Sequence, residues 1–102
     1  MTKIVVLFNL KDDVAISDYE NWARTRDLPI AGGLPSVDQF DILKSQGLLM
    51  SDATPPYQYI EVLAINDMDQ FGKDISSEEM QKVASEFQSF ADNPMFILCD
   101  QL

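Results

Sequence analysis

The sequence predicts an α+β domain with the element order β-α-β-β-α-β, in which helices lie on one side of an antiparallel sheet. Three observations predict it: runs of β-branched and aromatic residues near both ends of the chain, a long apolar stripe at helical spacing, and two S-x-x-E patterns that can begin helices. The chain has 102 residues and 46% of them are hydrophobic. It is therefore expected to form one compact domain, residues 1–102, and to be too short for two.

The first strand and the first helix are expected in the opening third of the chain. Residues 3–9, "KIVVLFN", have the composition of a strand. In "ISDYE", Ser17 and Glu20 have the spacing of a capping box, which predicts a helix from there to about Asp27. Pro29 is expected to end this helix, because proline removes a backbone donor.

Two further strands are expected in the middle of the chain. Residues 37–45, "VDQFDILKS", predict one, and residues 57–65, "YQYIEVLAI", predict the clearest strand of all because they combine tyrosines with β-branched residues. After them, "NDMDQFG" predicts a short helical turn closed by Gly72.

The last third predicts an amphipathic helix followed by a strand. Ser76 and Glu79 form a second capping box, and Asn93 with Pro94 should stop the helix. Residues 95–102, "MFILCDQL", then predict the final strand. The helix is identified by a continuous stripe at a period of about 3.6 residues, made of Met80, Val83, Ala84, Phe87, Phe90 and Ala91.

This order is the split β-α-β pattern of ferredoxin-like domains, whose sheet has one face open. In the first strand, however, Val5 and Leu7 point away from Ile4, Val6 and Phe8, so both faces are apolar. A sheet that is apolar on both faces needs a cover on the second one. A second copy is the simplest cover, so we expect a homodimer with face-to-face sheets and two-fold symmetry.

Charge and composition exclude several classes of protein. Seventeen acidic residues against seven basic ones give a net charge of −10, which disfavours nucleic acids and anionic membrane surfaces as partners. The apolar run from Ile4 to Phe8 is short for a signal peptide, and no run reaches transmembrane length. A cytoplasmic protein is expected.

The chain contains no histidine, which removes many kinds of active site. Histidine-dependent catalytic triads, imidazole zinc sites and histidine-ligated haem are all excluded. The aspartates lack calcium-loop spacing and no phosphate-binding glycine motif is present, so no metal and no cofactor are expected. The lone cysteine, Cys99, is expected to be a small buried apolar residue.

Arg26 is the first candidate for a functional residue. At about 100° per residue, Tyr19, Trp22 and Ala23 share one side of the expected helix, and Arg26 projects between them. Together they could line a pocket between this helix and the sheet, with Arg26 recognising a carboxylate, carbonyl or oxyanion. Alternatively, Arg26 reaches solvent and neutralises the helix C-terminus.

Glu61 is the second candidate, because it lies in the middle of an apolar strand. A partly desolvated carboxyl has a raised pKa and can act as a general acid or base. Alternatively, Glu61 pairs with a cross-strand lysine or lies at the rim of the dimer. Asn9 could donate to a substrate oxygen or cap the following turn. Tyr57 and Tyr59 could orient Glu61 or serve as core aromatics.

The segments "YENWARTRDLP", "PSVDQF", "PYQYIEVL" and "FADNPMFIL" together resemble the REDY-like family that includes HapK, over about residues 4–102. The resemblance implies a dimeric α+β barrel that takes part in making prodigiosin-type tripyrrole pigments. It implies an enzyme without a cofactor that closes the second ring of the bipyrrole precursor.

In that interpretation Arg26 and Asn9 would polarise the carbonyl and Glu61 would move protons. Tyr19, Trp22 and Tyr59 would hold the pyrrole or bipyrrole ring. Two other functions are compatible with the same residues: a cofactor-free monooxygenase acting on an electron-rich aromatic, and a non-catalytic protein that binds a pyrrole intermediate. Fold alone does not choose between them.

Overall fold

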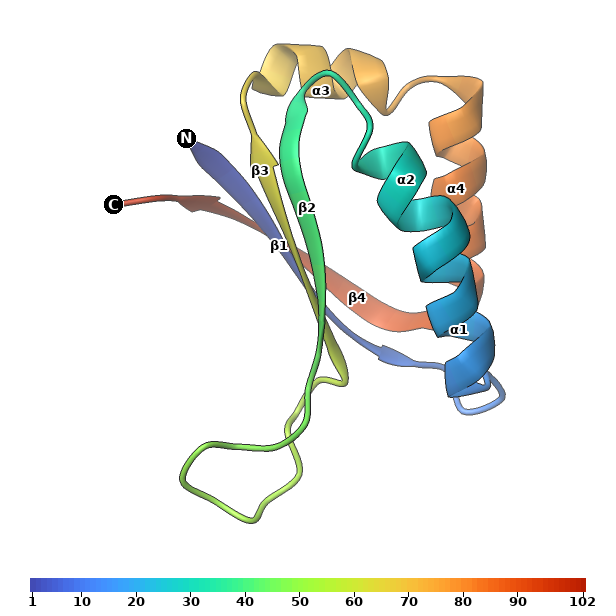
Figure 1. The fold of residues 1–102 in the computed structure, drawn as a ribbon, viewed down its shortest axis with the longest axis vertical. Helices are drawn as coiled ribbons and strands as arrows, with labels where there is room; N and C mark the ends of the chain where they lie inside the picture. The colour runs from blue at the N-terminus through green and yellow to red at the C-terminus, as the bar shows by residue number, and fades with distance from the viewer.

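The protein, described here by a computed structural model of all residues 1–102, is one four-stranded antiparallel sheet with every helix on the same side (Figure 1). The strands lie in the order β2-β3-β1-β4, so the expected ferredoxin-like arrangement is confirmed. No helix is long and apolar enough to cross a membrane. The elements are β1 (Thr2–Leu10), α1 (Ile16–Trp22), η1 (Ala23–Asp27), α2 (Leu28–Ala31), β2 (Val37–Lys44), β3 (Tyr59–Ile65), α3 (Met68–Asp74), α4 (Glu78–Phe90) and β4 (Ala91–Asp100).

The first helix begins differently from the expectation. Ala15 is the N-cap of this helix, and no side chain caps the helix start, so the prediction of a capping box at Ser17 is wrong. The reason is that Glu20 points toward the sheet, where its carboxylate accepts from the Tyr59 hydroxyl at 2.6 Å and pairs with Lys44 at 2.7 Å. These charge-assisted contacts replace the bond to the helix start.

The same helix also passes the proline that was expected to end it. The segment η1 is a π-helix, closed by a bond from the Leu28 backbone N–H to the Ala23 carbonyl. α2 starts immediately after it, with Pro29 in its first turn. Proline is tolerated there because the first N–H groups of a helix need no partner within it. The helical stretch therefore runs to Ala31.

The second half of the chain differs in its boundaries. α3 is a helix of seven residues that continues through Gly72, with Asp67 as its cap. The cap of α4 is Ser77, one residue after the expected Ser76. β4 follows α4 directly and already includes Asn93 at a φ of 46°, beside an irregularity in its pairing with β1. The irregularity lets the strand start four residues before the expected position.

The strand pairing assigns every side chain to a face of the sheet. One row of directly opposite residues runs Ile42–Glu61–Val6–Phe96, and the next runs Phe40–Leu63–Ile4–Leu98. Both rows face the helices, and their central members are buried. The core continues from them toward Phe8, Tyr19 and Tyr59, which pack ring against ring.

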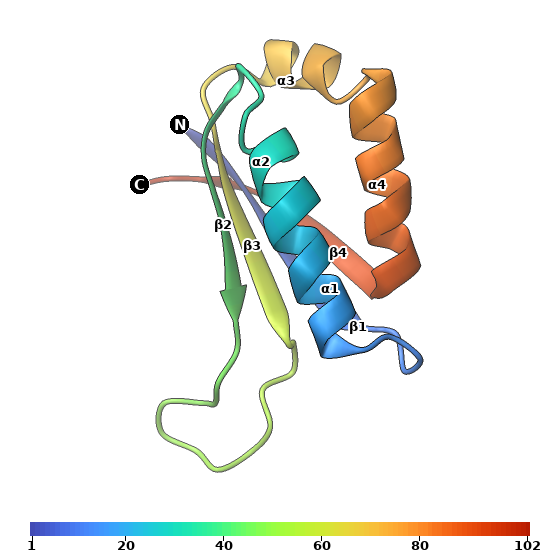
Figure 2. The ribbon, with the colours of Figure 1, turned by 45° about the vertical axis from the view of Figure 1, so that its right-hand side comes forward.

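The opposite face of the sheet has no cover within the chain, as Figures 1 and 2 show. Its middle rows contain Val62–Val5–Ile97 and Ile60–Leu7–Met95. Cys99 lies on this face and is half-buried in the single chain, less than was expected. The loop of residues 45–58 extends well away from the sheet and the helices (Figure 1).

Candidate functional site

A large cavity lies between the helix-facing side of the sheet and helices α3 and α4. Its volume is about 660 Å³, within the range of small-molecule sites. The two rows described above, apart from Ile42, form its floor, and apolar side chains of α3 and α4 form its roof. It is lined by Ile4, Val6, Asp27, Ala31, Phe40, Glu61, Leu63, Met68, Phe71, Gly72, Ile75, Met80, Gln81, Val83, Ala84, Phe87, Gln88, Phe96 and Leu98.

Glu61 is the buried polar group of the cavity floor. Its exposed fraction is 5%, and its ladder neighbours Val6 and Ile42 are apolar. The Oε2 atom is buried without a hydrogen-bond partner. Burial and then the nearby Asp27 carboxyl raise the pKa of Glu61 well above its ordinary value. Glu61 therefore faces the helices, and neither a cross-strand lysine nor a dimer rim accounts for it.

Asp27 is a second buried carboxyl at the same cavity. It is the last residue of η1, its exposed fraction is 6%, and no side chain pairs with it as an ion. Burial raises its pKa to about 7. Two carboxyl groups that are both desolvated and close together resist double ionisation, so near neutral pH one can hold a proton while the other does not.

Tyr19 completes the buried polar groups of this region. It is fully buried, packed between Phe8, Tyr59 and Phe90, and its hydroxyl has no hydrogen-bond partner. Burial, with the charges of Glu61 and Asp27 as the next causes, raises the pKa of Tyr19 above its ordinary value. Tyr19 therefore stays a neutral hydroxyl beside the carboxyl pair.

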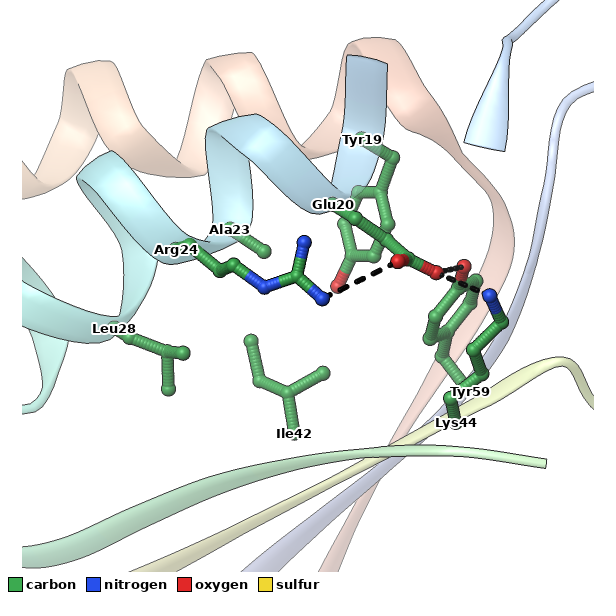
Figure 3. A pocket seen from close by; sticks show the side chains of 8 residues that line it. All are labelled: Tyr19, Glu20, Ala23, Arg24, Leu28, Ile42, Lys44 and Tyr59. Atoms are coloured by element: carbon green, nitrogen blue, oxygen red, sulfur yellow. Dashed lines mark hydrogen bonds and ion pairs between the residues drawn. The ribbon is translucent and has the colours of Figure 1, made fainter. Parts of the chain in front are cut away.

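The pocket expected between the first helix and the sheet exists but is small, about 110 Å³ (Figure 3). Tyr19 and Tyr59 line it, whereas Trp22 and Arg26 do not. Its polar side is a network in which the Glu20 carboxylate accepts from Tyr59 and pairs with Lys44 and Arg24. These three donors occupy Glu20, so the network is explained without a ligand.

Arg26 is held by α4 and lies outside the lining of both cavities. Its Nε donates to Oε1 of Glu86 at 2.8 Å and its terminal nitrogen donates to Oε2 at 3.3 Å. The Trp22 indole N–H donates to the same Oε1 at 2.9 Å. The hydrogen bond from Trp22, and after it that from Arg26, lowers the pKa of Glu86. The group therefore fastens the first helical stretch to α4, a contact that sequence periodicity within one helix does not reveal.

Asn9 and Tyr57 lie at the base of the long loop. The Asn9 side chain donates to the Pro56 carbonyl at 3.1 Å and accepts from the Gln58 backbone N–H at 2.9 Å. The Tyr57 carbonyl accepts from the Ser45 hydroxyl at 2.6 Å. Both residues connect the loop to the sheet just before β3 begins, and neither lines the large cavity.

Of the seven residues singled out in the sequence, only Glu61 lines the large cavity. Sequence analysis missed Asp27, because it was expected only as the approximate end of the first helix. The signal that could have found it is Pro29, since a helical pattern that continues across a proline indicates a local change of helix type. No group of three or more histidine, cysteine, aspartate or glutamate side chains could hold a metal ion.

A sequence model of one protein family, described as REDY-like protein HapK, matches residues 2–102. Among solved structures, the crystal structure of HapK from Hahella chejuensis has a TM-score of 0.78 and 27% identity, with 100% of this chain and 93% of that chain covered. No curated protein matches the sequence.

Two more distant structures have the same fold. A dimeric ferredoxin-like protein of unknown function from Thermobifida fusca has a TM-score of 0.79 and 14% identity, covering 98% of this chain and 90% of that chain. A mutant of SnoaB, a cofactor-independent oxygenase from Streptomyces nogalater, has a TM-score of 0.73 and 16% identity, covering 98% and 91% respectively.

Proposed function

Because this chain belongs to the HapK family of REDY-like proteins, we propose that it is an enzyme without a cofactor that closes the second ring of a bipyrrole precursor of prodigiosin-type pigments. The observation that carries the proposal is the pair of buried carboxyl groups, Glu61 and Asp27, on the wall of a large apolar cavity. A ring closure between an amine and a carbonyl needs proton transfers and no redox group, which suits this pair.

The proposed reaction is the ring closure of an open-chain pyrrolyl amino-ketone. The amine nitrogen attacks the carbonyl carbon, and a C–N bond forms. The ionised carboxyl accepts a proton from nitrogen, while the protonated carboxyl donates one to the carbonyl oxygen, which becomes a hydroxyl. The carboxyl that gained the proton then donates it to this hydroxyl, the C–O bond breaks and water leaves. A C=N bond forms at the same time, and the remaining N–H proton returns to the other carboxyl. General acid and base catalysis of this kind contributes roughly 10²- to 10⁴-fold in rate.

The apolar cavity contributes by holding the two ends of the precursor together. Oriented intramolecular reactions have large effective molarities, so positioning alone can supply much of the rate. Apolar walls from α3 and α4 also suit the flat pyrrole ring and exclude water from the reacting groups. Asp27 takes part in this proposal beside Glu61.

A cofactor-free monooxygenase is the second candidate, favoured by the fold shared with the oxygenase SnoaB. A binding protein for a pyrrole intermediate is the third. The deciding experiment is a time course of ring closure of a pyrrolyl amino-ketone, with and without the purified protein, first without oxygen and then with it.

Acceleration without oxygen is the expected result. Product that forms only with oxygen would identify a monooxygenase and contradict the ring-closure proposal. No product above the uncatalysed rate under either condition, together with saturable binding of the precursor, would identify a binding protein.

We further propose that the chain forms a homodimer through the uncovered face of its sheet. The apolar row Val62–Val5–Ile97 lies in the middle of that face. A buried aspartate there would be costly, so Val62→Asp is expected to halve the mass measured by analytical ultracentrifugation. Ile16→Asp, on the helix side, is the control and should remain dimeric. An unchanged mass in Val62→Asp, or a monomeric parent protein, would contradict this interface.

A further inference from the structure

We infer that the large cavity selects ligands whose buried end is a hydrogen-bond-donating amine, above all an ammonium group, and that it rejects carboxylates. The inference deepens the proposed function. It rests on that function only in taking this cavity as the place where the ligand binds. It is opposite to the expectation from the sequence, in which Arg26 would recognise an oxygen-rich group.

The first argument is the hydrogen bonding of Glu61. Its Oε2 is buried and has no partner in the chain. An unpartnered buried acceptor costs free energy of the order of 1–3 kcal/mol, and a donor on a ligand would remove that cost. Since an ionised carboxyl only accepts hydrogen bonds, the complementary ligand group is a donor.

The second argument is the charge of the lining. Its polar members are two carboxyl groups and two carboxamides, and none of its residues is a lysine or an arginine. Three basic side chains near the cavity are engaged elsewhere: Arg26 pairs with Glu86, and Arg24 and Lys44 pair with Glu20. Lys73 on α3 and Lys82 on α4 do not line the cavity. A carboxylate in the cavity would therefore have no counter-ion in a poorly solvated place, and ionisation of either carboxyl group beside it would add repulsion.

The third argument is that one end of the cavity is buried and the other is open to solvent. Glu61 and Asp27 are buried, whereas Phe96 and Leu98 on the edge strand β4 are 62% and 68% exposed. All four residues line the same cavity, and Phe96 shares a row of the sheet with Glu61. The ligand is thus expected to enter across β4, with its amine toward the carboxyl pair and its apolar part against β4, α3 and α4.

Binding of an ammonium group should also release a proton. Both carboxyl groups hold protons more tightly than usual, and a bound cation favours their ionised form. The titratable groups around Glu61 are Asp27 on η1 and Tyr19 on α1. The other neighbours are uncharged: Val6 on β1, Ile42 on β2, and Gln81 and Gln88 on α4.

The test is isothermal titration calorimetry of the intact protein with three probes that share one apolar body: 4-phenylbutylamine, 4-phenylbutanol and 4-phenylbutyrate. At pH 6.5 the amine is expected to bind at least about tenfold more tightly than the carboxylate. Titrations in buffers with different ionisation enthalpies should show protons released on amine binding. The affinity for the amine should increase with pH up to about 7.5, while that for the alcohol should not.

Two variants test whether the carboxyl pair causes the preference. The double variant Asp27→Asn, Glu61→Gln should bind the amine and the alcohol with similar affinity and release no protons. Glu79→Gln, which removes an exposed carboxyl of α4, should behave as the parent protein.

Equal affinities for amine and carboxylate, a preference that survives in the double variant, or no binding of any probe would overturn the inference. Ring closure is measured separately, so the two proposals can fail independently. A protein that prefers the amine but does not accelerate ring closure would refute only the proposed reaction. A protein that accelerates ring closure without preferring amines would refute only the inference.

Discussion

The free energy of unfolding is expected to fall as the pH rises from about 4 to about 7, because Asp27 is harder to ionise in the folded protein than in the unfolded chain. Its pKa is about 7 when folded and 3.8 ordinarily. Below pH 4 both states are protonated and burial has little cost. Above pH 7 the folded protein must hold a buried charge, at a cost of up to about 4 kcal/mol, since one pKa unit is about 1.4 kcal/mol. Glu61 acts in the same direction.

Other carboxyl groups have the opposite effect at lower pH. The pKa values of Glu20 and Glu86 are lowered, first by their hydrogen bonds to Lys44 and Trp22 respectively. The stability that these two groups contribute is lost as the pH falls through their lowered pKa values. Maximum stability is therefore expected in mildly acid solution.

The measurement is urea unfolding at constant protein concentration between pH 3.5 and 8, for the parent protein and for Asp27→Asn. Between pH 4 and 7 the free energy of unfolding should fall much less in the variant than in the parent. At pH 8 the variant should be more stable than the parent. Asp13→Asn, in an exposed turn, controls for the loss of one negative charge from a protein of net charge −10. If the free energy of unfolding depends on pH in the same way in Asp27→Asn and in the parent, Asp27 is not buried as a carboxyl.

Glu61→Gln is expected to slow ring closure by roughly 10²- to 10⁴-fold and, at pH 8, to raise the free energy of unfolding. The rate falls because the carboxamide cannot accept or donate the proton. Stability rises because the carboxamide has nearly the same shape and removes the cost of ionising a buried group without a partner as the pH increases. A residue that served only packing would not change activity and stability in opposite directions.

The control and the double variant make this prediction specific. Glu79→Gln removes an exposed acid and should leave both quantities close to those of the parent. If Glu61 and Asp27 act as one unit, Asp27→Asn combined with Glu61→Gln should slow ring closure little more than Glu61→Gln alone. Retained activity in Glu61→Gln, or a loss of stability at pH 8, would refute the role given to this carboxyl.

The order of the elements could be predicted from the sequence, because each strand and each long helix has a clear local signal. The apolar character of β3 and the presence of a carboxyl in its middle also follow from the sequence, whereas the face of the sheet on which Glu61 lies does not. The boundaries were less predictable. Ser17 has the spacing of a capping box, but Glu20 bonds instead to Tyr59 and Lys44, which lie far away in the sequence. Such long-range contacts are invisible to a local pattern.

The candidate site was only partly predictable, and the reason is the π-helical segment η1. A helical wheel assumes about 100° per residue, but a π turn holds an extra residue and rotates the side chains that follow it. Arg26 consequently bonds to Glu86 on α4, while Asp27 lines the cavity. A regular helix predicts the arginine in the pocket, whereas the observed one presents the carboxyl.

The most direct test of the central claim is to find where the bipyrrole product binds. Backbone amide chemical shifts would be followed by NMR while the product is added to the isotope-labelled protein. If the product binds in the large cavity, saturable chemical-shift changes are expected around Phe71, Val83 and Leu98. They should be lost in the double variant Asp27→Asn, Glu61→Gln. Shifts confined to Ala23, Ile42 and Lys44 would instead place the ligand in the small pocket beside α1, and would contradict the role of the buried carboxyl pair.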